Sequence, residues 1–178
     1  MDFIASVKER IPDYAKDIRL NLDAVLARSS LEPTHAAGAA LAAAVASKSK
    51  PLTDAIRSGS TLEPAHVQAA LGAAALMGMN NVWYPYLEMA DDPDLKTVRA
   101  ELRMNAYASH GGVDQVSFEL YALAASIVGK CQFCVRSHYK LLREKGFSTQ
   151  QLRDVGRIAA VVNAAAQVIA AEVEAVVA

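Results

Sequence analysis

The sequence has few of the residues that interrupt helices and few of the aromatic residues that favour sheets. Nine glycines and six prolines occur among 178 residues, and aromatic residues make up 6%. Alanine instead makes up about a fifth of the chain, and it has the highest helix propensity of the amino acids. With 53% hydrophobic residues, the chain is too apolar to be disordered. The composition predicts a helical globular protein and, at roughly 100–200 residues per domain, a single domain.

An excess of charge of one sign is also lacking. Eighteen Lys and Arg residues face 19 Asp and Glu residues, for a net charge of −1, whereas a nucleic-acid-binding protein usually carries a basic patch or stripe. No apolar run reaches the roughly 18 residues of a membrane-spanning helix without a charged or polar interruption. Residues 1–10 carry charges where an export signal needs an apolar core. We therefore expect a cytoplasmic protein that binds neither nucleic acid nor a membrane.

Cysteine is the scarcest reactive residue. The chain has two, Cys131 and Cys134, in a C-x-x-C motif. Without an export signal, two cysteines argue against a disulfide-stabilised scaffold. A C-x-x-C pair in a reducing compartment indicates redox chemistry or metal binding instead.

Helix start and stop signals divide the chain into a series of helices. We expect a bent or broken connection over residues 80–94, because this stretch contains turn-forming residues and Pro85. No stretch alternates strongly enough to predict a strand, so the predicted fold class is all-α. The expected helices cover about residues 3–11, 13–28, 33–47, 51–58, 64–79, 95–107, 114–128 and 131–145, with a last one from 148.

Two segments 82 residues apart resemble each other. Ala40–Lys48 (ALAAAVASK) and Ala122–Lys130 (ALAASIVGK) share five of nine residues. This predicts a duplicated helical unit within one domain spanning 1–178, with a degenerate repeat over about 31–90 and an active repeat over about 113–178. In this alignment the two cysteines face Ser49 and Leu52, so that only the second half keeps reactive groups.

Four residues of the second half form a candidate catalytic site. Cys131, Cys134 and His138 are spaced i, i+3 and i+7, which places them on one face of a helix. The helix start favours a thiolate, and His138 is a suitable proton acceptor. Glu119 on the preceding helix could orient His138 if the two helices form an antiparallel hairpin. Such a set suffices for a dithiol that attacks a peroxide or a disulfide.

Other interpretations of these residues remain open. The cysteines could be small buried hydrophobes, or they could bind zinc with His138, His110 being a fourth ligand only if the fold returned it. Glu119 alone could be a solvated charge. We interpret His35, His66 and His110 as surface or helix-cap histidines. The remaining candidates, which we assign to core or oligomer contacts, are Trp83, Tyr84 and Tyr86.

At these four residues the sequence resembles the AhpD-like alkyl hydroperoxidases of the carboxymuconolactone decarboxylase superfamily. The pattern Glu119…Cys131-x-x-Cys134-x-x-x-His138 is similar to that family's signature, and the likeness extends to residues 11–22, 70–84 and 102–105. The resemblance implies an all-helical fold of two related halves, a homotrimer and a cytoplasmic antioxidant role. It also implies that no cofactor is tightly bound, and that dihydrolipoamide on a lipoylated protein reduces the dithiol. The dithiol would then reduce a partner peroxiredoxin or, more weakly, alkyl hydroperoxides directly.

The resemblance also assigns roles to the residues. Cys134 would react with peroxide to form a sulfenic acid, Cys131 would be the proton donor and resolving thiol, and Glu119 and His138 would form a proton relay. Several relatives have a histidine where this chain has Phe133, so any auxiliary role of that histidine is absent here. The helix dipole alone would make Cys131 the more acidic thiol, but a dipole contributes only about 0.3–1 kcal/mol, and a nearby base outweighs it.

Two alternative functions follow from the same residues. A decarboxylase of the same superfamily needs no dithiol, so the C-x-x-C motif argues against it. A non-enzymatic helical adaptor would bind zinc, which metal analysis of the purified protein would detect. The favoured hypothesis is therefore a lipoyl-dependent peroxidase and disulfide reductase.

Overall fold

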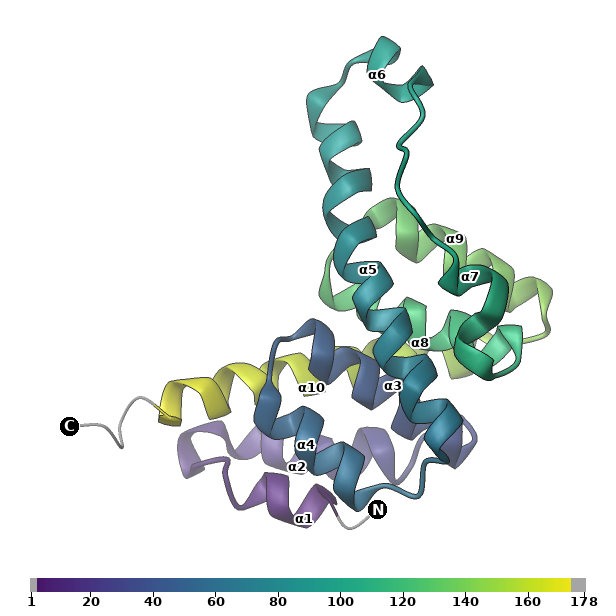
Figure 1. The fold of residues 1–178 in the computed structure, drawn as a ribbon. Coiled ribbons are helices and arrows are strands. Elements are labelled where there is room, and N and C mark those ends of the chain that lie inside the picture. The colour runs from purple at the N-terminus through teal and green to yellow at the C-terminus, as the bar shows by residue number, and fades with distance from the viewer. Residues whose placement is uncertain (1–2, 174–178) are drawn as a thin grey trace.

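The computed structural model describes residues 3–173 and is all-α, with no strand in that range (Figure 1). The first half contains α1 (Phe3–Lys8), a 3₁₀ turn η1 (Asp13–Ala15), α2 (Lys16–Leu26), α3 (Pro33–Ala46), α4 (Lys50–Gly59) and α5 (Pro64–Ala90). The second half contains α6 (Pro93–Thr97), α7 (Ala106–Ser109), a 3₁₀ turn η2 (His110–Gly112), α8 (Gln115–Val128), α9 (Gln132–Glu144) and α10 (Thr149–Val173). The predicted fold class is confirmed.

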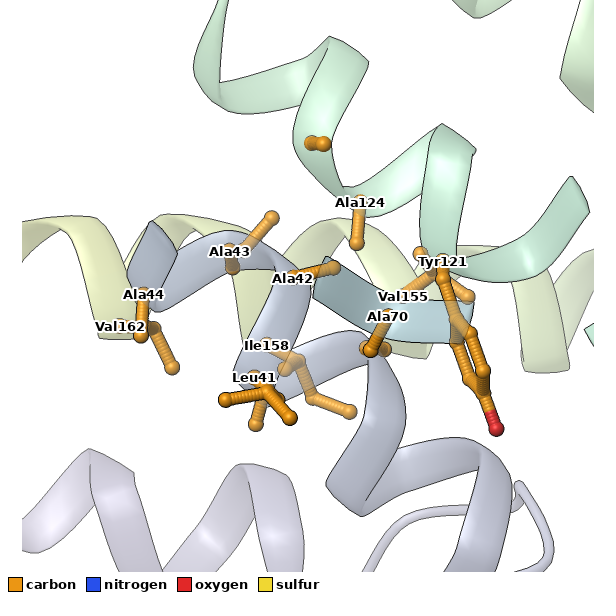
Figure 2. Close-up of a cluster of buried hydrophobic side chains, with 14 of the residues drawn as sticks. Leu41, Ala42, Ala43, Ala44, Ala70, Tyr121, Ala124, Val155, Ile158 and Val162 are labelled. Atoms are coloured by element: carbon orange, nitrogen blue, oxygen red, sulfur yellow. The ribbon is translucent and has the colours of Figure 1, made fainter. Parts of the chain in front are cut away.

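The core lies where α3, α5, α8 and α10 pack against one another (Figure 2). Alanine lines most of these contacts, and residues 39–44 of α3 are fully buried. Gly38 lies directly against the ring of Tyr121 in α8, where a Cβ atom would overlap the ring. Small side chains let the helix axes approach closely, and the few large ones, such as Tyr121, Leu41 and Ile158, fill the space between them.

The helix start signals in the sequence act as expected. Asp114 caps α8 by accepting a hydrogen bond from the Ser117 backbone N–H at 3.0 Å. Ser148 and Gln151 form a reciprocal capping box before α10, with bonds of 2.9 and 3.1 Å. These caps fix the residues at which α8 and α10 begin. The start of α8 in turn sets which of its residues lie next to the cysteines that follow it.

The prediction of a bent or broken connection over residues 80–94 is wrong for residues 80–90, because the helix breaks only at residues 91–92. Helix α5 continues through Pro85 to Ala90. Pro85 removes one backbone hydrogen bond, that to the carbonyl of Asn81, but this part of α5 is only partly buried, so water can satisfy that carbonyl. The preceding turns of α5 are already packed in the core, and extending an existing helix costs far less than starting one.

The predicted helix over residues 95–107 is also wrong. The chain forms the short α6, has no regular secondary structure over residues 98–104, and becomes helical again only in α7. Glu101 has a left-handed backbone conformation with φ of +52°, which is incompatible with a helix. Val98 and Leu102, 64% and 39% exposed, have no core to pack against, and a short helix without such packing is unstable in water. The upper part of α5, α6 and this irregular segment form an arm, residues 82–104, that projects from the body (Figure 1).

The two segments that resemble each other in sequence also form the same turn. Lys48 and Lys130 both have a φ of +57°. The next residue in each case, Ser49 or Cys131, donates its backbone N–H to the carbonyl five residues earlier and caps the following helix with its side chain. The local geometry is thus repeated 82 residues apart, as the alignment requires; the division into repeats over 31–90 and 113–178 stays a prediction.

Among the described residues, one helical segment, Thr149–Glu172, is long and apolar enough to cross a membrane by length and composition. This segment belongs to α10, which packs against α2, α3 and α8. A core helix passes the same test, so the segment is weak evidence for a membrane span.

Candidate active site

The α8–α9 turn holds the two cysteines at the start of α9. Cys131 is the N-cap residue, and its Sγ lies 3.2 Å from the backbone nitrogen of Cys134. Cys131 and Cys134 are joined by a disulfide with a Cα–Cα distance of 5.3 Å. Both side chains are at least 97% buried. The positive end of the α9 dipole and the free N–H groups of its first turn favour a thiolate at either cysteine after reduction.

Glu119 and His138 form a buried pair beside the disulfide. Helix α9 folds back against α8, which brings the Glu119 carboxylate to 2.5 Å from Nδ1 of His138. Both residues are about 95% buried. A buried carboxylate is retained at such a position when it has a partner, and here the partner is an imidazole that faces the site. The hairpin geometry that the sequence suggested is therefore present, while the catalytic roles of the four residues stay predictions.

The hydrogen bond to Glu119 fixes which nitrogen of His138 is available for proton transfer. With Nδ1–H donated to the carboxylate, Nε2 carries the lone pair of the neutral ring. Nε2 lies 3.4 Å from the Tyr107 hydroxyl and 3.3 Å from Sδ of Met77. The imidazole is also stacked with the Tyr107 ring, with an interplanar angle of 21°. Tyr107 is therefore the polar neighbour of the nitrogen that can accept a proton.

A cavity of about 250 Å³ opens next to these groups. It brings Cys134 and His138 together in one space, where Cys131 is the buried and Cys134 the accessible member of the pair. The other lining residues are Asn80, Tyr84, Met104, Tyr107, Phe133 and Ser137. Because Cys134 and not Cys131 lines the cavity, Cys134 is the sulfur that a small incoming molecule meets first.

Phe133, between the cysteines, points out of α9 and stacks on Tyr84 of α5 at 4.2 Å between ring centroids. Phe133 is 48% exposed. Both rings line the cavity, and both also line a second, apolar cavity of about 270 Å³ with Leu87, Glu88 and Lys96. The sequence predicts a core or oligomer contact for Tyr84, and in the structure its ring lines the active-site cavity.

Electrostatics keep the Tyr107 hydroxyl protonated. Burial raises the pKa of Tyr107 far above its usual value, and the negative charge of Glu119 and the nearby Tyr84 raise it further. A hydrogen bond with the Asn80 side-chain amide lowers this pKa by a smaller amount. A phenol in this setting acts as a hydrogen-bond donor and does not ionise at neutral pH.

Sequence reasoning missed two residues of the site, Asn80 and Tyr107. Asn80 is 3% exposed, its Oδ1 has no hydrogen-bond partner among the described residues, and its carbonyl oxygen lies 4.0 Å from Sγ of Cys131. The sequence predicts a bent or broken connection at Asn80, which in fact lies within α5. It predicts the end of a long helix at Tyr107, which in fact lies in the short α7. No motif marks either of them; the one available signal is that Asn80 lies within the resemblance over 70–84 and Tyr107 two residues after that over 102–105.

The remaining histidines lie away from the cysteines. His35 Nε2 is 3.1 Å from the Ser117 hydroxyl, and His66 Nδ1 is 2.7 Å from the Tyr121 hydroxyl. Burial lowers the pKa of His35, an effect that Asp114 partly offsets. Both residues lie in the first turns of their helices but are only partly exposed, so they hold helix ends together and do not merely cover the surface.

The zinc hypothesis requires the cysteines and His138 to converge on one ion with a fourth ligand. Within residues 3–173, no group of three or more His, Cys, Asp or Glu side chains is arranged so that it could hold a metal ion. His110 packs against Phe118 and does not complete such a set.

Comparison with known proteins gives matches along nearly the whole chain. Residues 93–175 match the model of the carboxymuconolactone decarboxylase family. The alkyl hydroperoxide reductase AhpD of Rhodospirillum centenum is 46% identical over 171 residues, covering 95% of this chain and 91% of the relative. The protein of the same name from Gluconacetobacter diazotrophicus is 41% identical over 165 residues (92% and 90%), and that from Coxiella burnetii is 38% identical over 170 residues (93% and 96%).

Proposed function

The chain belongs to the AhpD alkyl hydroperoxide reductases of the carboxymuconolactone decarboxylase family, and from that premise we propose how its site reduces peroxides. The protein is an oxidoreductase in which the Cys131–Cys134 dithiol reduces alkyl hydroperoxides. The observation that carries this function is the disulfide at the start of α9, with a buried Glu119–His138 pair beside it and a cavity that exposes Cys134.

The reaction proceeds in two steps at the cysteines. His138 accepts the proton of the Cys134 thiol, and the thiolate attacks the terminal oxygen of the hydroperoxide. The S–O bond forms and the O–O bond breaks. The departing alkoxide receives the proton that His138 took from the thiol, and it leaves as the alcohol. Cys131 then attacks the sulfur of the Cys134 sulfenic acid and releases water as the disulfide forms. Glu119 orients the imidazole and stabilises its protonated form.

We further propose that a dihydrolipoyl group carried on a lipoylated protein reduces this disulfide. One lipoyl sulfur attacks Cys134, the more accessible cysteine, and forms a mixed disulfide with it while Cys131 is released as a thiol. The second lipoyl sulfur then attacks the first and releases Cys134, so that two electrons and two protons pass to the dithiol. The dithiol then serves hydroperoxides directly or reduces the disulfide of a partner peroxiredoxin. The cavity of about 250 Å³ beside Cys134 supports access by a slender dithiol arm.

The experiment is a coupled assay in which lipoamide dehydrogenase and NADH keep lipoamide reduced while tert-butyl hydroperoxide is consumed. We expect NADH oxidation that depends on the protein and on lipoamide and that is lost in Cys134→Ser. Thioredoxin with its reductase is the control donor and should not support the reaction. Turnover by Cys134→Ser near the wild-type rate would contradict the peroxidase assignment, and turnover with thioredoxin alone would contradict the lipoyl donor.

Cys131→Ser separates the two steps. Without its resolving thiol, the variant should consume one equivalent of peroxide and stop at the sulfenic acid of Cys134, because no disulfide can form. Continued turnover of Cys131→Ser at the wild-type rate would show that the reductant itself resolves the sulfenic acid and that Cys131 is dispensable.

We also propose that the protein is a cytoplasmic homotrimer and that the arm contributes to its subunit contacts. The arm carries large exposed apolar side chains, including Met89 at 78%, Val82 at 69% and Val98 at 64%. Several large apolar groups exposed on one projecting segment suit an interaction surface, and a second copy of the chain is the partner that is always present. Sedimentation at micromolar concentration tests this, and a monomer would contradict it.

A further inference from the structure

The unpaired amide oxygen of Asn80 indicates that the cavity is built to receive a hydrogen-bond donor. Asn80 is 97% buried, and its Oδ1 has no partner among the described residues. Leaving a buried acceptor unpaired is unfavourable, and nearly all such atoms in folded proteins are paired. Asn80 lines the same cavity as Cys134, and its side-chain amide also interacts with Tyr107, so a hydrogen-bond donor that enters the cavity lies beside this amide.

The hydroxyl of Tyr107 is the complementary group. It lies on the other side of His138 from Glu119, 3.4 Å from Nε2, and it lines the same cavity. Its ring is held by an edge-on contact with Phe118 and by stacking on His138, so the hydroxyl has little freedom to turn away. Asn80 and Tyr107 therefore present an acceptor and a donor to one small space.

A hydroperoxide requires these two groups when a thiolate attacks it. Its terminal oxygen carries the only O–H donor, and its inner oxygen becomes an alkoxide as the O–O bond breaks. An alkoxide is a strong base and a poor leaving group unless an acid protonates it in the transition state.

We propose that Tyr107 is the acid that protonates the departing alkoxide and that Oδ1 of Asn80 accepts the hydrogen bond of the hydroperoxide O–H. This inference rests on the peroxidase function proposed above and adds two catalytic residues to it. The Cys134 thiolate attacks the terminal oxygen, Tyr107 gives its proton to the inner oxygen, and the alcohol leaves. His138, protonated earlier by the Cys134 thiol, returns that proton from Nε2 to the Tyr107 oxygen. The thiol proton thus ends on the alcohol, and Cys134 becomes a sulfenic acid.

The experiment measures second-order rate constants for reaction of the prereduced protein in single turnovers, without any lipoyl donor. Three reagents are compared: tert-butyl hydroperoxide, peracetic acid and iodoacetamide. The first releases an alkoxide that needs a proton. The second releases acetate, which is stable as an anion at neutral pH because carboxylic acids ionise near pH 4. The third alkylates the Cys134 thiolate and carries no hydroperoxide O–H.

Tyr107→Phe should lower the rate constant for tert-butyl hydroperoxide about 100-fold, since general acids commonly contribute 10²–10⁴-fold. The rate constants for peracetic acid and iodoacetamide should stay within about threefold of wild type. Asn80→Ala should slow both peroxides equally, by about two- to tenfold for one lost neutral hydrogen bond, and leave iodoacetamide unchanged. Tyr121→Phe is the matched control, because it removes a buried hydroxyl that bonds His66 outside the cavity; it should leave all three rates unchanged.

Equal losses with all three reagents in Tyr107→Phe or Asn80→Ala would assign that residue a structural role and overturn its part of the proposal, as would wild-type rates with tert-butyl hydroperoxide. If Tyr107→Phe does not fold, wild-type rates with hydroperoxides of different leaving alcohols decide. A built-in acid makes them nearly independent of the acidity of the alcohol, and a steep dependence contradicts it. A wild-type protein that reacts with neither peroxide would contradict the peroxidase function itself.

Discussion

Replacing Glu119 by glutamine tests whether the buried carboxylate serves the reaction or the fold. Glu119→Gln keeps the shape of the side chain but removes the charge that faces Nδ1 of His138 at 2.5 Å. The glutamine amide can still accept the Nδ1–H bond, so the imidazole stays in place. What it loses is the charge that stabilises the protonated ring after it has taken the proton of Cys134.

The size of both effects follows from this geometry. A hydrogen bond to a charged group is worth about 1.5–3 kcal/mol and a neutral one about 0.5–1.5, so the variant loses about 1–2 kcal/mol of stability. At 2–4 °C per kcal/mol for a chain of this size, the melting temperature falls by about 2–8 °C. The rate of oxidation by tert-butyl hydroperoxide should fall about 100-fold or more, the lower end of what a general base contributes.

Asp154→Asn provides the matched control. Asp154 is also a buried carboxylate, 2% exposed, but it accepts hydrogen bonds from Ser30, Arg153 and Arg157 and lines no part of the active-site cavity. It should lower the melting temperature and leave the oxidation rate at the wild-type value. Single-turnover thiol oxidation and thermal melting of both variants make the comparison. A Glu119→Gln protein that oxidises within threefold of wild type while it melts more than 10 °C lower would refute the relay.

The remaining predictions concern stability and assembly. Burial of Asp154 is outweighed by its hydrogen bonds to Ser30 and the two arginines, so the pKa of this carboxyl lies well below the ordinary value. Its contribution to the stability of the fold is complete above about pH 4 and is lost as the pH falls further. Asp154→Asn should therefore flatten the acid limb of a profile of melting temperature against pH, and an unchanged limb would contradict this. Gly38→Ala places a methyl group on the Tyr121 ring and should cost about 1–3 kcal/mol, measured by denaturant unfolding; an unchanged midpoint would show that α3 and α8 can separate freely. Met89→Glu with Val98→Glu should give monomers in sedimentation while single-turnover oxidation persists, and an unchanged oligomer would exclude the arm from the interface.

Much of the fold follows from local signals in the sequence. Proline at the first helical position removes one of the N–H groups that a helix start leaves unpaired. The Asp114 cap and the Ser148–Gln151 box satisfy others within a few residues, so these signals act in the same way whatever surrounds them. The arm does not follow from such signals. Whether α5 continues past Pro85 depends on turns already packed in the core, and whether residues 98–104 form a helix depends on the absence of a surface for them to pack against.

The candidate site divides in the same manner. Cys131, Cys134 and His138 share one helix end, and Glu119 is brought to them by a hairpin of adjacent helices, so spacing alone predicts their proximity. Asn80 approaches the site from α5, and Tyr107 approaches it from α7, which follows the arm in the chain. Their position depends on tertiary packing over 51 and 24 residues of separation from Cys131, and no spacing rule reaches across such a distance.

The most direct test of the account is to find which cysteine is oxidised first. Prereduced Cys131→Ser and Cys134→Ser are each treated with one equivalent of tert-butyl hydroperoxide in the presence of dimedone, and the labelled peptide is identified by mass spectrometry. The account predicts rapid labelling of Cys134 in Cys131→Ser and little labelling of Cys131 in Cys134→Ser, because Cys134 shares a cavity with His138. Equal or faster labelling of Cys131 would mean that the helix dipole governs reactivity, and it would contradict the role given to the Glu119–His138 pair.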